Sequence, residues 1–160
     1  KMLLSSVKSC LSTRRLERLF SVAPARGMDV ICPTIGLSPE RAEFYHMARA
    51  FADSELRPFA SKWDRECSFP HETFKKLGEI GFGGWLVSEV NGGTALKRAD
   101  VMPIIEGLAT GCVSTTALLT IQNANALVID KHGTEEQRKR WLPGLLKMEK
   151  LVSFCLTEPG

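Results

Sequence analysis

The last seven residues of the chain carry the groups best suited to holding a ligand. They are an apolar run that enters a turn: Phe154, Cys155, Leu156, Thr157, Glu158, Pro159 and Gly160. Proline presets one backbone angle of a turn, and glycine permits the positive φ that follows. A strand edge leading into such a turn offers backbone N–H groups and the Thr157 hydroxyl to a polar, anionic or heterocyclic ligand. We therefore expect these residues to form part of a binding site.

A second candidate is a ridge of small side chains at Thr116, Thr120 and Ala124, spaced by four residues. On a helix this spacing places all three on one face. Such a ridge leaves room either for a neighbouring helix to approach closely or for a ligand to lie alongside. Physical chemistry alone favours the neighbouring helix over the ligand.

The other reactive side chains form no recognisable catalytic or metal-binding arrangement. His46, His71 and His132 fall on a helix face or at helix ends, which is typical of caps and surface histidines. The loop 91–94 lacks the glycine spacing of the phosphate-binding motifs. The five cysteines show no CxxC pairing and are interpreted as free thiols in a reducing compartment. We predict no metal site and no catalytic residue within these 160 positions.

Helical periodicity dominates the chain from residue 38 to residue 148. The first expected helix starts at the Ser38 N-cap, is interrupted before Pro58 and continues through Trp63. Two further helices are expected over 71–80 and over 98–111, the second with Pro103 in its first turn. The last two are expected over 115–131, capped by Ser114, and from the Thr134 capping box to Leu142, where Pro143 ends the helix. Leu151–Leu156 reads as a strand. Five or six helices followed by one strand predict an all-α domain that continues into a β domain, and most of that β domain is expected to lie beyond this sequence.

The positive charge is concentrated in the first 29 residues, which hold six basic and two acidic side chains. The other 131 residues hold fifteen basic and sixteen acidic side chains and are nearly neutral. Residues 1–29 alternate apolar positions with Arg, Lys and Ser, the pattern of a mitochondrial presequence. A disordered basic tail is the other interpretation. Residues 30–37 are read as a linker, and no segment approaches the roughly 18 apolar residues of a membrane span.

Several motifs in combination resemble the N-terminal half of the acyl-CoA dehydrogenase family over about residues 35–160. They are the final Leu-Thr-Glu-Pro-Gly (156–160), Gly-Cys-Val-Ser-Thr-Thr (111–116), His-Gly-Thr-Glu-Glu-Gln (132–137) and the loop Val-Asn-Gly-Gly (90–93). Segments 106–112 and 148–150 most resemble the members that act on isobutyryl-CoA in mitochondrial valine breakdown. The resemblance implies an α-helical N-terminal domain (38–148) and a middle β-barrel, whose first strand would begin within 149–160. A C-terminal helical bundle would follow the barrel.

The resemblance also implies an activity. It is the α,β-dehydrogenation of an acyl-CoA thioester, in which a base removes the α-proton and the β-hydride passes to FAD. Electrons would then pass to electron transfer flavoprotein. The enzyme would be a homotetramer in the mitochondrial matrix.

The same resemblance assigns roles to particular residues. Phe154, Leu156 and Thr157 stand where the family contacts the flavin ring, and Cys155 and 158–160 belong to the same motif. The ridge 116, 120, 124 stands where the family lines its acyl pocket, and short side chains there suit a short or branched acyl group. The family's catalytic glutamate has no counterpart in this sequence, so we expect the chain to be inactive alone and to bind FAD weakly or not at all.

Two classes of function follow. The first is the N-terminal fragment of a mitochondrial flavoenzyme. The second is a short non-catalytic helical protein that docks on partner subunits. The reading frame beyond Gly160 separates them, since continuation of the coding sequence supports the first and an in-frame stop supports the second.

Overall fold

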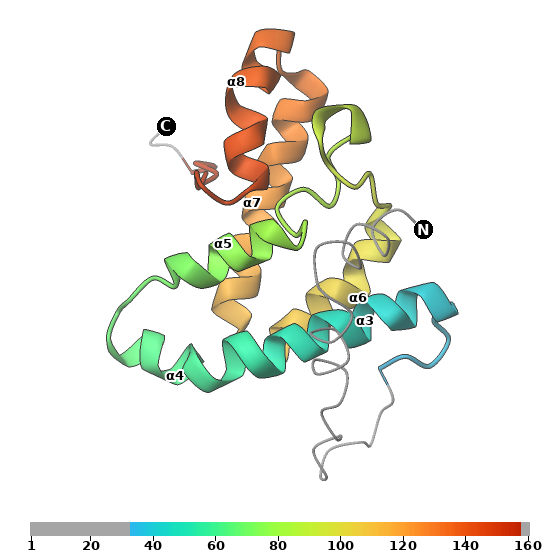
Figure 1. Cartoon of the computed structure of the whole chain (residues 1–160), viewed down its shortest axis with the longest axis vertical. Coiled ribbons are helices and arrows are strands. Elements are labelled where there is room, and N and C mark those ends of the chain that lie inside the picture. The colour runs from blue at the N-terminus through green and yellow to red at the C-terminus, as the bar shows by residue number, and fades with distance from the viewer. Residues whose placement is uncertain (1–32, 158–160) are drawn as a thin grey trace.

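The computed structural model describes residues 33–157, and within them the chain forms six α-helices, a π-helical turn and a short 3-10 helix (Figure 1). In chain order these are α3 (Pro39–Phe51), η1 (Ala52–Leu56), α4 (Arg57–Arg65), α5 (His71–Glu79), η2 (Glu89–Asn91), α6 (Arg98–Ala109), α7 (Val113–His132) and α8 (Glu135–Leu146). The predicted all-α domain is confirmed for this part of the chain. The predicted presequence and Glu158, Pro159 and Gly160 lie outside the described residues.

The first helices form one long rod along the edge of the molecule, made of α3, η1 and α4 (Figure 1). The Ser38 hydroxyl caps its start by accepting a hydrogen bond from the Arg41 amide over 3.4 Å. The predicted break before Pro58 is a π-helical turn, in which the Arg57 amide bonds to the Ala52 carbonyl five residues back. Proline cannot donate such a bond, so the wider turn accommodates its ring without ending the rod.

Helices α3 and α6 lie side by side because small residues line their contact (Figure 1). A Cβ atom added to Gly107 would lie 2.8 Å from the Cβ of Ala48, and one added to Gly111 would lie 2.9 Å from the Cβ of Ala52. Only the absence of side chains at both glycines permits this approach. An ion pair of 2.7 Å between Arg41 and Asp100 joins the beginnings of the two helices.

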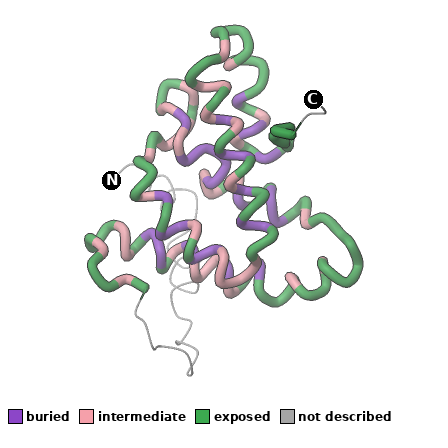
Figure 2. The backbone as a smooth tube through the Cα atoms, turned by 180° about the vertical axis from the view of Figure 1, so that it is seen from behind, coloured by how far each residue is buried: buried purple, intermediate pink, exposed green. Residues whose placement is uncertain are grey.

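The main hydrophobic core lies where α3, α5, α6 and α7 meet, as the buried segments of Figure 2 show. Its largest members come from helices and from the loop after α5: Phe44, Leu56, Phe74, Leu77, Phe82, Trp85, Ile104, Leu108 and Leu119. A smaller cluster of Val87, Ala126 and Leu142 joins α7 to α8. The first part of the loop after α5 (82–87) therefore packs against both clusters, since Phe82 and Trp85 belong to the first and Val87 to the second.

Two prolines differ from their predicted positions. Pro103 lies in the middle of α6 rather than in its first turn, and Pro143 lies within α8 instead of ending it. Each proline removes one helical hydrogen bond. Burial of the flanking apolar residues, such as Leu142 and Leu145 in α8, offsets that loss. Tertiary packing thus overrides the local signal.

Helix α7 begins two residues earlier than expected. Its N-cap is Cys112, not Ser114, and the Cys112 Sγ accepts a 3.5 Å hydrogen bond from the Thr115 amide. The Thr115 hydroxyl also donates to Sγ, over 3.2 Å. The capping box of α8 is confirmed, because the side chains of Thr134 and Gln137 each accept from the other residue's backbone amide, at 3.2 and 2.8 Å.

The strand expected at Leu151–Leu156 does not form in the described structure, where residues 151–157 have no regular secondary structure. A strand is defined by ladder hydrogen bonds to a neighbour. Residues 153–157 make no backbone hydrogen bond with another described residue. The apolar and β-branched sequence supplies strand propensity but no partner.

Candidate functional site

Helix α7 is inverted in polarity relative to an ordinary surface helix. Its buried side is Thr115, Thr116, Leu119, Gln122, Asn123 and Ala126, whereas its exposed apolar side chains are Val113, Leu118, Ile121 and Val128. A surface helix normally buries its apolar stripe. Within residues 33–157, the outer face of α7 is therefore apolar surface that nothing covers, which suits a ligand or a further packed domain.

The three predicted ridge residues run from the interior to this outer face. Thr116 is buried, Thr120 is half-buried and Ala124 is exposed. The Thr116 hydroxyl donates to the Cys112 carbonyl over 2.8 Å, and the Thr120 hydroxyl donates to the Ala117 carbonyl over 2.7 Å. Both hydroxyl hydrogens are used within the helix, so the ridge offers a ligand mainly carbon atoms.

A groove continues from this face between α7, α8 and the segment after α8. It has a volume of about 720 Å³ and is lined by residues that include Val128, Trp141 and Leu151. The charged groups of Arg140 and Lys150 lie 4.9 and 5.0 Å from the Trp141 ring centre. Cations at this distance are attracted to an aromatic face. The groove is therefore lined mainly by apolar side chains, with Lys150 as the one lysine or arginine among its lining residues.

Two adjacent buried amides on α7 tie other segments to it, and the sequence analysis missed both. The Trp85 amide donates to Oδ1 of Asn123 over 2.8 Å, while Asn123 Nδ2 donates to the carbonyls of Phe82 and Leu119. Gln122 bonds in the same way to α8 and to the segment after it. The sequence signal for this role is the pair of consecutive amide side chains within an otherwise apolar helix. A buried amide needs hydrogen-bond partners, so such a pair indicates bonds to other segments.

Asp130, near the end of α7, holds the glycine-containing loop that follows Val87. Its carboxylate accepts from the Ser88 hydroxyl at 2.7 Å, from the Ser88 amide at 3.2 Å and from Asn91 Nδ2 at 2.6 Å. Burial alone would raise the pKa of Asp130, but these hydrogen bonds and the nearby charge of Arg138 lower it below its usual value. The loop is thus fixed by an ionised carboxylate.

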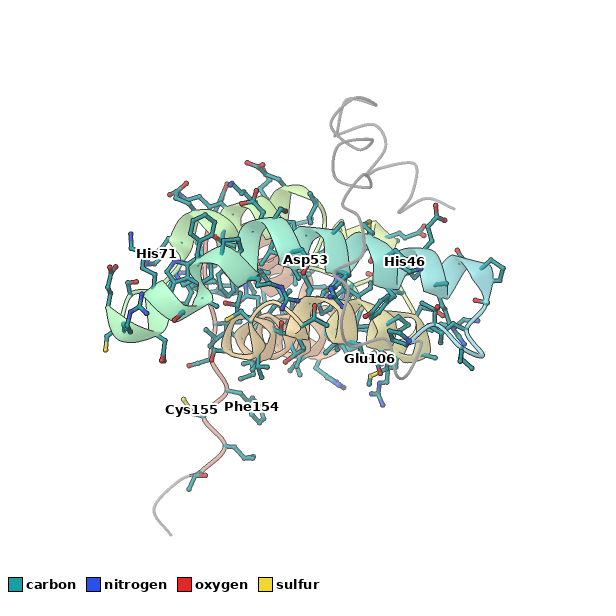
Figure 3. All side chains as sticks on the ribbon, turned by 90° about the horizontal axis from the view of Figure 1, so that it is seen from below. His46, Asp53, His71, Glu106, Phe154 and Cys155 are labelled. Carbon is teal, nitrogen blue, oxygen red and sulfur yellow. The ribbon has the colours of Figure 1, made fainter. Side chains whose placement is uncertain are left out.

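The predicted ligand segment leaves the helical body as an exposed tail, with Phe154 and Cys155 projecting from it (Figure 3). Phe154 is 62% exposed and Leu156 is 77% exposed. Cys155 is a free, exposed thiol and Thr157 is exposed as well. The side chains and backbone groups of 153–157 are therefore accessible to a ligand or to a further packed segment.

Two of the histidines, His46 and His71, lie apart from both candidate segments, whereas His132 ends α7 and lines the groove beside Val128 and Leu151. His46, His71 and His132 are all exposed, and Figure 3 shows His46 and His71 on separate parts of the helical body. Within residues 33–157 no three His, Cys, Asp or Glu side chains gather into a group that could hold a metal ion. None of the helices described is both long enough and apolar enough to cross a membrane.

This arrangement of helices is found in solved dehydrogenases. The fold matches glutaryl-CoA dehydrogenase from Mycobacterium smegmatis with a TM-score of 0.69 at 21% identity, covering 74% of this chain and 31% of that one. It matches butyryl-CoA dehydrogenase from Megasphaera elsdenii with a TM-score of 0.65 at 28% identity, covering 77% of this chain and 33% of that one. The described residues therefore share the fold of a part of these two dehydrogenases.

Sequence comparison identifies the family. The family model of the acyl-CoA dehydrogenase N-terminal domain matches residues 38–149, and the chain belongs to that family. It is 50% identical to the mitochondrial isobutyryl-CoA dehydrogenase of Dictyostelium discoideum, over 80% of this chain and 31% of the relative. It is 48% identical to that of Bos taurus, over 81% of this chain and 31% of the relative. The chain thus spans about a third of the length of these relatives.

Proposed function

We propose that this chain forms the N-terminal domain of a mitochondrial, FAD-dependent acyl-CoA dehydrogenase that oxidises isobutyryl-CoA in valine breakdown. The observation that carries the proposal is the inverted helix α7, which keeps its amides inside and presents small and apolar side chains outward. A domain that folds and functions alone would normally bury such an apolar face. In a larger enzyme the face can contact an acyl chain and further domains. The 50% identity to an isobutyryl-CoA dehydrogenase supports isobutyryl-CoA as the substrate.

In this proposal the ridge of Thr116, Thr120 and Ala124 forms one wall of the acyl pocket. Its hydroxyl hydrogens are bonded within α7, so the wall binds the acyl chain through carbon contacts. The wall also excludes water from the bonds that react. Short side chains leave room for the branch of an isobutyryl group.

The cofactor-binding residues are Phe154, Cys155, Leu156, Thr157, Glu158, Pro159 and Gly160. These residues would hold FAD, which would supply the hydride acceptor for oxidation of the substrate. In this segment the backbone N–H groups and the Thr157 hydroxyl would hold the polar edge of the flavin, and the exposed apolar side chains would cover its face. No residue of these 160 is proposed as the catalytic base.

The proposal extends to location and assembly. Residues 1–29 would act as the presequence that delivers the protein to the mitochondrial matrix, since both isobutyryl-CoA dehydrogenases that the chain resembles are named as mitochondrial. Electron transfer flavoprotein would accept the electrons. The working enzyme would be a homotetramer, with domain boundaries at residues 38 and 148.

The test uses the natural polypeptide that contains these residues. We expect it to copurify with FAD and to reduce electron transfer flavoprotein faster with isobutyryl-CoA than with longer straight-chain thioesters. Ala124→Phe narrows the proposed pocket and should lower kcat/KM for isobutyryl-CoA by about tenfold or more. Lys131→Phe adds the same ring to the exposed end of α7 and is the matched control. Equal loss in both variants, or a wild type without flavin, would contradict the proposal.

The apolar face of α7 also supports the alternative, a non-catalytic helical protein that docks on partner subunits. The two differ in what occupies the face. A natural product of this length that binds full-length dehydrogenase subunits and never holds flavin would favour docking. Flavin in the purified natural polypeptide would exclude it.

A further inference from the structure

Gln122 is a buried side chain whose amide makes three hydrogen bonds, as the neighbouring Asn123 amide does. It is 1% exposed. Its Nε2 donates to the Leu145 carbonyl over 3.1 Å and to the Lys150 carbonyl over 2.9 Å, while its Oε1 accepts from the Val152 amide over 2.9 Å. One amide of α7 therefore joins the end of α8 to the segment that leaves it.

These bonds fall at the point where the tail departs from the helical body. Residues 153–157 make no backbone hydrogen bond with another described residue, so Val152 is the last described position that a backbone bond fixes. Phe154 lies two residues further, and two residues span at most about 7 Å. The Val152 anchor therefore limits where the Phe154 ring can lie.

The chain direction at this point depends on the same bonds. After α8, Met148 adopts a left-handed conformation with φ of 57°, and the amides of Glu149 and Lys150 both bond to the Gly144 carbonyl at 3.0 Å. This tight turn reverses the chain toward α7. Gln122 then holds the returning segment from both sides, because it donates to residue 150 and accepts from residue 152.

A purely structural role would need less than this. Capping the α8 carbonyl of Leu145 requires one donor, and a leucine at position 122 would fill the core without any desolvation cost. The second donor and the acceptor both serve a segment outside any helix. A fully satisfied buried amide fixes one geometry, since any displacement of its partners leaves polar groups unpaired.

We propose that Gln122 is a positioning residue that fixes the flavin-contacting segment 154–157 by clamping residues 150 and 152 to α7. The proposal rests on the flavin role given to that segment above. Gln122 touches neither cofactor nor substrate. It acts through the Val152 backbone, and its loss should loosen the tail and the end of α8 while leaving the Trp85 loop in place.

The test compares Gln122→Met with Asn123→Leu in the natural polypeptide. Methionine keeps the length and burial but removes all three bonds, whereas Asn123→Leu removes an equally buried amide that serves the Trp85 loop. Hydrogen exchange at the Val152 amide should accelerate about tenfold in Gln122→Met, with the Trp85 amide unchanged, and Asn123→Leu should show the reverse. Gln122→Asn, which keeps the amide but falls short of its partners, should resemble Gln122→Met.

Flavin readouts complete the test. Gln122→Met should weaken FAD binding about tenfold and broaden the visible flavin spectrum, while Asn123→Leu of equal or lower stability should change neither. A flavin-loaded wild type whose Gln122→Met variant keeps its affinity, spectrum and Val152 exchange would overturn the role of Gln122 alone. Absence of flavin from the wild type would overturn the proposed function itself and the flavin role of Gln122 with it.

Discussion

Asn123 and Trp85 are joined by a buried hydrogen bond in which the Trp85 amide donates to Oδ1 of Asn123 over 2.8 Å. The two residues are 38 positions apart, and the bond holds the loop 82–95 against α7. The same side chain donates to the Phe82 carbonyl over 2.9 Å. The loop also has backbone hydrogen bonds of its own, such as that from the Thr94 amide to the Gly84 carbonyl, so the Asn123 amide serves to tie an already folded loop to α7.

Asn123→Leu should lower the free energy of unfolding by about 1–3 kcal/mol, because it leaves the Trp85 amide and the Phe82 carbonyl buried without partners. Urea denaturation at neutral pH measures the change. Asn125→Leu is the matched control, since Asn125 donates only to the Ile121 carbonyl of its own helix. An unchanged denaturation midpoint in Asn123→Leu would show that water reaches the loop.

The Asp130 carboxylate should make stability depend on pH. Its pKa is lowered in the folded state, so its contribution is present above the unfolded pKa of about 3.9 and is lost as the pH falls through the folded value. Asp130→Asn should therefore cost about 1–2 kcal/mol at pH 7, and the difference from wild type should shrink as the pH falls below the unfolded pKa and through the lower folded one.

Urea midpoints at several pH values test this dependence. Asp64→Asn changes an exposed carboxyl on α4 and serves as the control. If Asp130→Asn lost the same stability at pH 3 as at pH 7, the hydrogen bonds rather than the charge of the carboxylate would stabilise the loop.

Replacing Gly107 by alanine should destabilise the domain by about 1–3 kcal/mol, although alanine is the better helix former. The new Cβ would lie 2.8 Å from both the Ala48 Cβ and the Tyr45 carbonyl oxygen, and neither can move without shifting α3. Gly144→Ala is the control, because its Cβ would meet only the flexible Lys150 side chain, at 3.0 Å or more. Thermal unfolding of both variants should separate them, and an equal response would mean that α3 and α6 can move apart.

The sequence predicted the elements of this fold whose signals are local. Ser38 and Thr134 cap α3 and α8 as predicted, and the π-helical turn lies directly before Pro58, where the break was predicted. Errors arose where tertiary packing decides. Pro143 does not end α8 because its neighbours are buried, and the strand at 151–156 lacks a partner.

In the candidate site, too, the local pattern was predictable and the tertiary arrangement was not. The ridge on α7 follows from helical spacing, but which face of α7 is buried could not be predicted, because the polar residues Gln122 and Asn123 point inward. An apolar stripe of Ile121, Ala124 and Val128 indicates a core-facing side by pattern alone. The structure shows the stripe outside, since the buried amides are needed to hold the segments that cross α7.

The apolar face of α7 should also govern how the 160-residue chain behaves alone. Ile121 is 40% and Val128 is 50% exposed, and clustered apolar surface of this kind promotes self-association. Ile121→Glu with Val128→Glu should therefore reduce the apparent particle mass in light scattering. Ser114→Glu adds charge to the same helix at an exposed polar position and should leave self-association nearly unchanged. If Ser114→Glu reduced the particle mass equally, net charge rather than this face would control association. The apolar face that contains Ile121 and Val128 would then not be a contact surface.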